Sequence, residues 1–182
     1  MKSSMSDPRF VISVLGFVGV IYFGFIERPN IKQCFLKAHS EYLFQNGISA
    51  YRAGNLFQAE RFWRESLSEQ ESDSYLTFQA SESAINLGHT LSRLGKTEEA
   101  ESMFKRALQI RGKHGSVGCM ATSLYDLGCF YLCHGRLQEA EPLLKESLAI
   151  RTRIYGPNHD DTIDSQKIMI ELAKSKQVEY RS

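Results

Sequence analysis

Apolar residues recur at helical spacing through most of this chain, and one arrangement of them appears three times. In the third copy, Ala140 is followed by Leu144, then by Ser147 and Leu148, with mostly polar residues between them. Spacings of three and four residues place such side chains on one face of an α-helix. The pattern therefore predicts three amphipathic helices, within FQAERFWRESL, TEEAESMFKRALQI and LQEAEPLLKESLAI. Their matching positions are Ala59, Ala100 and Ala140, then Trp63, Phe104 and Leu144.

A pair of glycines predicts another helix before each of these three. The second glycine of a pair suits the left-handed residue that ends a helix. The first lies inside the helix, where glycine costs about 1 kcal/mol relative to alanine, so its repetition indicates close approach of a neighbouring helix. The copies are 41 and 40 residues apart, and this period indicates a helical solenoid in which each repeat stacks on the next. They read Gly47–Gly54–Ala59–Glu60, Gly88–Gly95–Ala100–Glu101 and Gly128–Gly135–Ala140–Glu141.

The second helix of each copy also carries a glutamate four residues before a basic residue. Such pairs stabilise an exposed helix face by about 0.2–0.5 kcal/mol each. The three pairs are Glu60 with Arg64, Glu101 with Lys105 and Glu141 with Lys145.

The register of small and large residues resembles the tetratricopeptide repeat. Leu87-Gly88 and Leu127-Gly128, followed by Leu91 or Tyr131, match its consensus. The phrases GKTEEAESMFKRALQIRGKHG and GRLQEAEPLLKESLAIRTRIYGPNHDD are similar to its longer, kinesin-light-chain-type variant. The resemblance implies that the chain binds proteins and is not an enzyme.

The predicted fold is all-α, a short solenoid of three helix pairs plus a C-terminal capping helix, preceded by one transmembrane helix. After Gly156-Pro157, Asp160 and Asp161 offer an N-cap for the last helix, and a polar outer face on that helix suits a solenoid cap. The predicted segments are a flank at 1–9, a membrane anchor at 10–26, a linker and helix start at 27–39, the repeat domain at 40–176 and a tail at 177–182. Within the domain we expect repeats at about 40–76, 81–116 and 121–155, and the cap helix at 160–176.

The segment Phe10–Ile26 holds 17 residues without a charge. As a helix it would be about 25 Å long, the short end of what spans a hydrocarbon core. It is apolar on every side, which favours a retained membrane anchor over a helix buried against protein. The bulky residues after it disfavour a cleaved signal peptide. Both flanks are mildly basic, so the orientation stays open, and similarity to organelle signal anchors favours a mitochondrial membrane.

Composition and motifs exclude several classes of function. The chain has 22 basic and 21 acidic residues, and this balance gives no footprint for a nucleic acid. No catalytic motif or cofactor site is evident, so we expect no cofactor and no catalysis. The four cysteines are expected to be structural thiols, and Cys119 and Cys129 lie too far apart on one predicted helix for a disulfide. A metal site of Cys129, Cys133 and His89, and with it a thiol- or metal-dependent enzyme, stays as an alternative.

The repeat register predicts an apolar, aromatic groove along the first helices, suited to a helix or apolar strand of a protein partner. Asp126 stands where chaperone-binding members of the repeat family carry a cation, so binding of a terminal carboxylate is not expected. The alternative is a narrow groove that the chain's own flanking helix fills. The predicted groove residues are Phe44, Ile48, Tyr51, Ile85, His89, Tyr125, Cys129 and Leu132, with Ser92 beside them.

These observations favour a membrane-anchored protein-interaction module. It would act as a scaffold, assembly factor or accessory subunit of a membrane protein complex. The alternative is an anchored receptor that binds incoming polypeptides.

Overall fold

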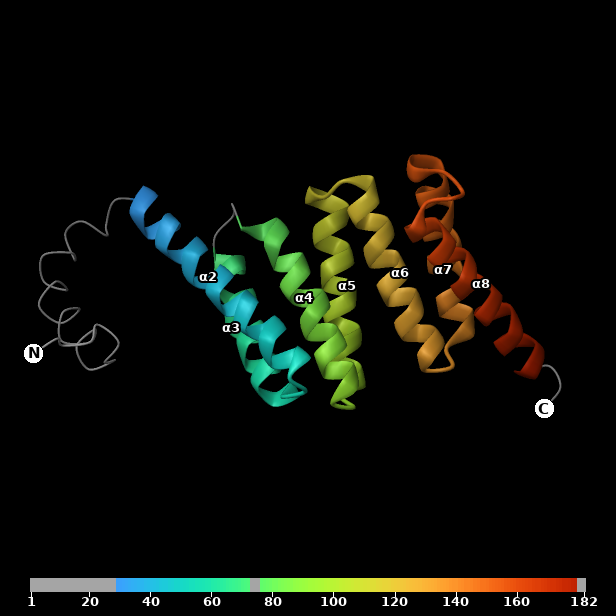
Figure 1. Cartoon of the computed structure of the whole chain (residues 1–182), viewed down its shortest axis with the longest axis horizontal. Helices are drawn as coiled ribbons and strands as arrows, with labels where there is room; N and C mark the ends of the chain where they lie inside the picture. Colours follow the sequence, from blue (N-terminus) through green and yellow to red (C-terminus); the bar gives the residue numbers. More distant parts are fainter. Residues whose placement is uncertain (1–28, 73–75, 180–182) are drawn as a thin grey trace, which may run out of the picture. The chain divides into compact units, whose positions relative to one another are not determined.

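A computed structural model of the chain describes residues 29–72 and 76–179 (Figure 1). These residues form seven α-helices and no strand, which confirms the all-α prediction. No helix among them is long and apolar enough to cross a membrane, and the predicted anchor at Phe10–Ile26 lies outside the described residues. The helices are α2 (Pro29–Arg52), α3 (Leu56–Ser72), α4 (Thr77–Arg93), α5 (Thr97–His114), α6 (Val117–Cys133), α7 (Leu137–Tyr155) and α8 (Asp160–Glu179).

The chain divides into two compact units, Met1–His39 and Ser40–Ser182. In the first unit, the described residues are the beginning of α2, where the rings of Phe35 and His39 stack at 6.2 Å between centroids. The second unit contains the repeats.

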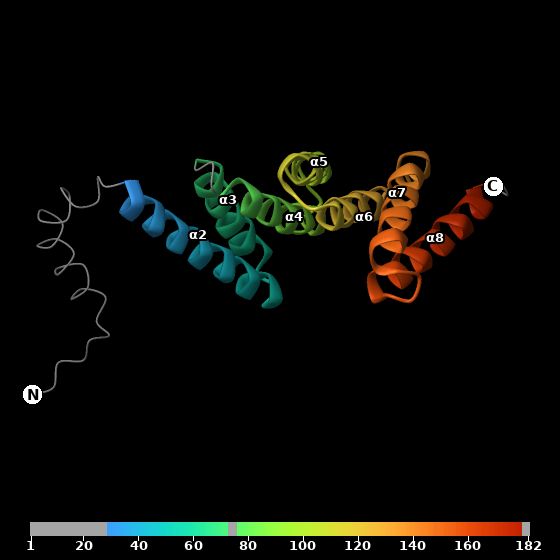
Figure 2. The ribbon, with the colours of Figure 1, turned by 90° about the horizontal axis from the view of Figure 1, so that it is seen from above.

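Consecutive helices of the second unit pack against one another (Figure 1). Seen from above, α5 lies on one side of α4 and α6 (Figure 2). The first helices α4 and α6 therefore share a side that α5 leaves uncovered.

Left-handed glycines end the first helices, as predicted. The φ angles of Gly54, Gly95 and Gly135 are 78°, 76° and 70°. In the second repeat, the backbone N–H of Lys96 donates to the Leu91 carbonyl at 2.9 Å, which satisfies a carbonyl that the end of the helix leaves unpaired. The turns that follow are three residues long, so each second helix folds back directly on its first.

The inner glycines lie against the large residues of the second helices, as predicted. A Cβ added at Gly47 would lie 2.8 Å from the ring of Trp63, and one at Gly128 would lie 2.7 Å from Leu144. At Gly88 the corresponding neighbour is Phe104, at 3.0 Å. The absence of a side chain at these positions allows the two helices of a repeat to approach closely.

A large apolar core runs through the second unit, with a smaller cluster of Ala121, Leu124 and Ile150 beside it. The large residues of the second helices, Trp63, Phe104 and Leu144, are almost fully buried in it. Phe104 also meets Phe130 of the next repeat, with 5.3 Å between ring centroids. The core therefore joins repeats as well as the helices within each repeat.

The start of α8 differs from the prediction. Asp160 and Asp161 do not precede the helix but form its first turn, where acidic residues favour the helix dipole. The residue before the helix is His159, whose carbonyl accepts from the N–H groups of Thr162 and Ile163. Its Nδ1 also accepts from the N–H of Asp161. The imidazole therefore caps the helix N-terminus, a role that serine, threonine, asparagine or aspartate has in most helices.

Candidate functional site

The predicted groove residues lie on α2, α4 and α6, and we call the surface that they form the first-helix face. Contacts connect the face across repeats. Arg93 of α4 lies over the ring of Tyr51 of α2, 4.9 Å from its centroid, and His89 of α4 lies beside Asp126 of α6. The members of the face are Phe44, Ile48, Tyr51, Ile85, His89, Tyr125, Cys129 and Leu132.

Most of these side chains are only partly available to a partner. Phe44, Ile48, Tyr51, Tyr125, Cys129 and Leu132 are half-buried and pack against the core. The ring of Phe44, for example, meets Trp63 edge-on at 5.0 Å between centroids. Ile85 is buried in the core, with 9% of its surface exposed, so it offers little to a partner. His89 is exposed, and its ring stands edge-on to Phe104 at 4.9 Å.

Tyr125 and Cys129 form the centre of the α6 part of the face. Burial raises the pKa of the Tyr125 hydroxyl, and its neighbour Cys129 raises it further. The guanidinium of Arg151 lies over the Tyr125 ring, 4.5 Å from its centroid. Burial also raises the pKa of the Cys129 thiol to about 12, which makes the thiol a poor nucleophile at neutral pH.

The alternative metal site is not formed. No group of three histidine, cysteine or acidic side chains in residues 29–72 and 76–179 could hold a metal ion. Cys129 is half-buried and Cys133 exposed, while the His89 ring faces Phe104 and Asp126. All four cysteines are free thiols.

Asp126 is a feature of the face that sequence reasoning did not select as a site. Its side chain is 17% exposed, and the imidazole of His89 lies beside it, with 4.0 Å between Nε2 and Oδ1. Burial raises the pKa of Asp126, although His89, Arg111 and Arg151 pull it in the opposite direction. Only its departure from the repeat consensus marked this residue in the sequence.

Two buried arginines each join a second helix to the helix that follows it, and the sequence reasoning missed both. Arg111 of α5 donates through Nε to the Ser81 hydroxyl at 3.0 Å and also reaches the Cys119 carbonyl. Arg151 of α7 donates to the Asp161 carbonyl at 3.0 Å and to the Ser165 hydroxyl at 2.9 Å. The repeated Ile-Arg dipeptide at 110–111 and 150–151 was the available signal.

The glutamates of the second helices bind more cations than the predicted pairs. Glu60 also accepts from Lys96, Glu101 from Arg136 and Glu141 from Lys176, and each of these cations lies in the next repeat or in α8. Burial would raise the pKa of Glu60, but hydrogen bonds from Lys96 and Arg64 outweigh it and lower the pKa. Each glutamate therefore bridges its own helix and the following repeat.

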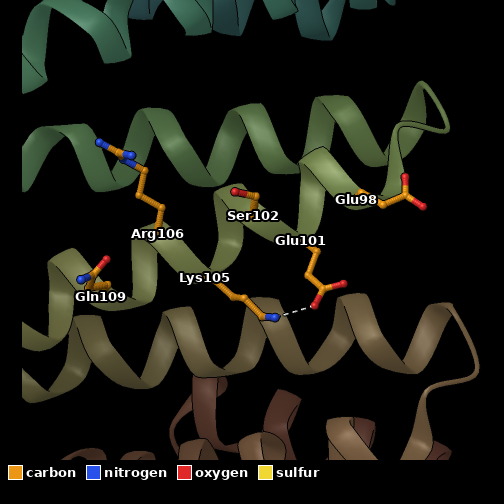
Figure 3. Close-up of a pocket in the computed structure, with 6 residues that line it drawn as sticks. All are labelled: Glu98, Glu101, Ser102, Lys105, Arg106 and Gln109. Carbon is orange, nitrogen blue, oxygen red and sulfur yellow. Dashed lines mark ion pairs between the residues drawn. The ribbon is translucent and has the colours of Figure 1, made fainter.

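A shallow depression of about 520 Å³ lies along α5, the second helix of the second repeat (Figure 3). Its lining comes from one helix, and the side chains of Lys105 and Glu101 in it pair with each other at 2.6 Å. Because no second element of the described chain lines it, the depression is part of the polar outer surface. It is lined by Glu98, Glu101, Ser102, Lys105, Arg106 and Gln109.

Comparison with known families identifies the repeats. Two tetratricopeptide-repeat profiles match the chain, at residues 40–113 and 120–161. The second unit is therefore a tetratricopeptide-repeat solenoid, a fold that serves as a scaffold for protein interactions. No curated protein matches the chain in sequence.

Solved structures show the same fold. BtubC (BKLC) from P. vanneervenii is similar with a TM-score of 0.67 and 19% identity, over 91% of this chain and 65% of that one. A Podosopora anserina protein described as a kinesin light chain with nearly identical TPR-like repeats gives 0.64 and 18%, over 78% and 66%. The apo form of RapI gives 0.70 and 15%, over 88% and 62%. This chain thus spans less than two thirds of the length of BtubC and RapI.

Proposed function

We propose that the chain is an interaction subunit that holds an apolar segment of a protein partner on its first-helix face. The observation that supports this is the line of half-buried apolar side chains on α2 and α6. Ile48, Tyr125 and Leu132 pack against the core on one side and keep exposed surface on the other. A partner segment that covers them would bury apolar area without any rearrangement of the repeats.

The test uses the full chain with one added charge on the face. Leu132→Glu places a carboxylate where the partner would bury it, and a buried carboxylate without a partner is strongly unfavourable. We expect this variant to lose the partner that co-purifies with the wild-type chain in mild detergent, while it still unfolds in a cooperative thermal transition that shows an intact fold. The matched control is Phe57→Glu, because Phe57 is 75% exposed on α3, outside the face. Equal loss with both variants, or retention with both, would contradict a role of the face.

The membrane part of the proposal rests on the sequence of Phe10–Ile26. We propose that this segment anchors the chain in a membrane, with a mitochondrial membrane favoured, and that the chain is a scaffold, assembly factor or accessory subunit of a complex there. Its 17 uncharged residues would otherwise expose a large apolar surface. The full chain should then resist extraction by alkaline carbonate and fractionate with mitochondria. Release by carbonate would mean that the segment packs against protein.

The same purification separates a subunit from a receptor for incoming polypeptides. A subunit co-purifies with its partners in fixed stoichiometry. A receptor co-purifies with less than one equivalent of bound polypeptide, and the polypeptides differ between preparations, because its ligands bind transiently.

A further inference from the structure

We propose that the partner segment carries a lysine or arginine that binds the Asp126 carboxylate on the first-helix face. This inference rests on the proposed function and adds the chemistry of the partner. The predicted ligand of the face is therefore a peptide that is apolar for most of its length and basic at one position.

The state of the Asp126 carboxylate is the first observation. The side chain is 17% exposed, so most of its hydration is lost. Within the described part of the chain it has no hydrogen bond, and the His89 contact at 4.0 Å is too long to be one. A largely buried carboxylate without a donor is unfavourable, and a donor brought by a partner would remove that cost.

The two nearby arginines do not fill this role. Arg111 and Arg151 are 7% and 5% exposed, and their hydrogen bonds go to Ser81, Ser165 and backbone carbonyls. Their charges reach Asp126 only through space, and burial still raises its pKa above the ordinary value. The carboxylate oxygens of Asp126 can therefore accept hydrogen bonds from a donor that approaches from solvent.

The residues around Asp126 indicate which kind of side chain carries that donor. Tyr125 precedes it, Cys129 follows one turn later, and Leu132 lies another turn on. Lysine and arginine have long aliphatic stems that lie along such apolar surface while the charged group reaches a carboxylate. An acidic partner residue would instead meet Asp126 as a like charge, so the site discriminates by charge as well as by apolar contact.

The test is a selection of peptides by the full chain. Random dodecapeptides displayed on phage are selected at neutral pH by the wild type, Asp126→Lys and Glu146→Lys, each immobilised in lipid nanodiscs. Glu146 is exposed on α7, away from the face, and its reversal makes the same change in net charge. We expect lysine and arginine to be enriched among peptides selected by the wild type and by Glu146→Lys. Asp126→Lys should replace this preference by aspartate and glutamate.

A second measurement stays valid if Asp126→Lys does not fold. One selected peptide and its version with the basic residue changed to glutamine are titrated against the wild type and against the nearly isosteric Asp126→Asn. The glutamine change should weaken binding to the wild type about tenfold or more and binding to Asp126→Asn less than about twofold, the signature of a direct charge pair. Equal losses in both proteins would overturn the inference.

The outcomes separate this inference from the proposed function. Two results would overturn the role of Asp126 and leave the face as a binding surface. In one, the wild type selects apolar peptides without enrichment of lysine or arginine. In the other, Asp126→Lys selects the same basic peptides as the wild type. The failure of every variant to select any peptide would overturn the binding face itself and this inference with it.

Discussion

At the scale of single residues, the inner glycines decide how closely the helices of a repeat approach. We expect Gly88→Leu and Gly128→Leu to lower the free energy of unfolding by about 1–3 kcal/mol or more, because the added atoms would overlap Phe104 and Leu144. Urea denaturation of the full chain measures the change. Gly112→Ala on α5 is the control: an added Cβ there meets nothing within 4 Å, and the change should stabilise the helix by about 0.4–1 kcal/mol. Unchanged midpoints for both leucine variants would show that the glycines do not set the packing.

Asp126 predicts a pH dependence of stability with a definite sign. Because folding raises its pKa, the folded state holds the proton more tightly than the unfolded chain. The ionised carboxylate therefore costs stability, and this cost is absent below the unfolded pKa and grows as the pH rises through the folded pKa. We expect Asp126→Asn to be more stable than the wild type at neutral pH, with a difference that shrinks on acidification. Thermal melts of both proteins across the acidic range provide the measurement, and a variant less stable than the wild type at neutral pH would contradict it.

At the scale of helices, charged side chains fix neighbouring repeats to each other. Hydrogen bonds from Arg136, Lys105 and Tyr131 lower the pKa of Glu101 to about 2 in spite of burial. The buried Arg111 and Arg151 add hydrogen bonds that run from a second helix to the following first helix. Side chains thus connect helices that belong to different repeats.

Removal of the Glu101 charge should weaken the junction between the second and third repeats. We expect Glu101→Gln to lower the free energy of unfolding by about 1–3 kcal/mol at neutral pH. Because folding lowers this pKa from 4.5 to about 2, the contribution is present above 4.5 and lost as the pH falls toward 2. Glu98→Gln, an exposed neighbour on α5, is the control and should change little. Urea denaturation at several pH values tests both, and equal effects of the two variants would contradict the role of the junction.

The sequence predicted those elements that rest on periodic local patterns. The glycines and the Trp63, Phe104 and Leu144 positions recur at a fixed register, so the helix pairs and their contacts could be derived. The burial of Arg111 and Arg151 could not be predicted, because an arginine is usually exposed and the partners of these two lie on other helices, far along the chain. For the same reason the predicted pairs within a helix were found, while the bonds of Glu101 and Glu141 to the next element were not.

For the candidate site, the register assigned the predicted residues to the first helices but did not predict how exposed each side chain is. Ile85 was expected on the face and is buried in the core, with 9% of its surface exposed. Asp126 was noted only for what it excludes. Its importance depends on how little of it is exposed and on where its neighbours direct their hydrogen bonds, and neither follows from spacing along the chain.

At the scale of the whole molecule, the second unit is a series of nearest-neighbour contacts joined by a large apolar core. The profile matches at 40–113 and 120–161 both lie within this second unit. The similar solved structures share its fold at 15 to 19% identity. The same fold is therefore formed by sequences that differ from this one at most positions.

The ionic bridges between repeats have a consequence for how such a chain evolves. The large residue inside each repeat differs, from Trp63 to Phe104 to Leu144, and each is matched to a glycine of its own repeat. The junctions, in contrast, all pair a glutamate with a cation from the following element. A duplicated repeat would contain both the glycine and the large residue that pack against each other. At each end it would again pair a glutamate with a cation. Gene duplication could therefore lengthen this array while the ionic part of each junction is kept.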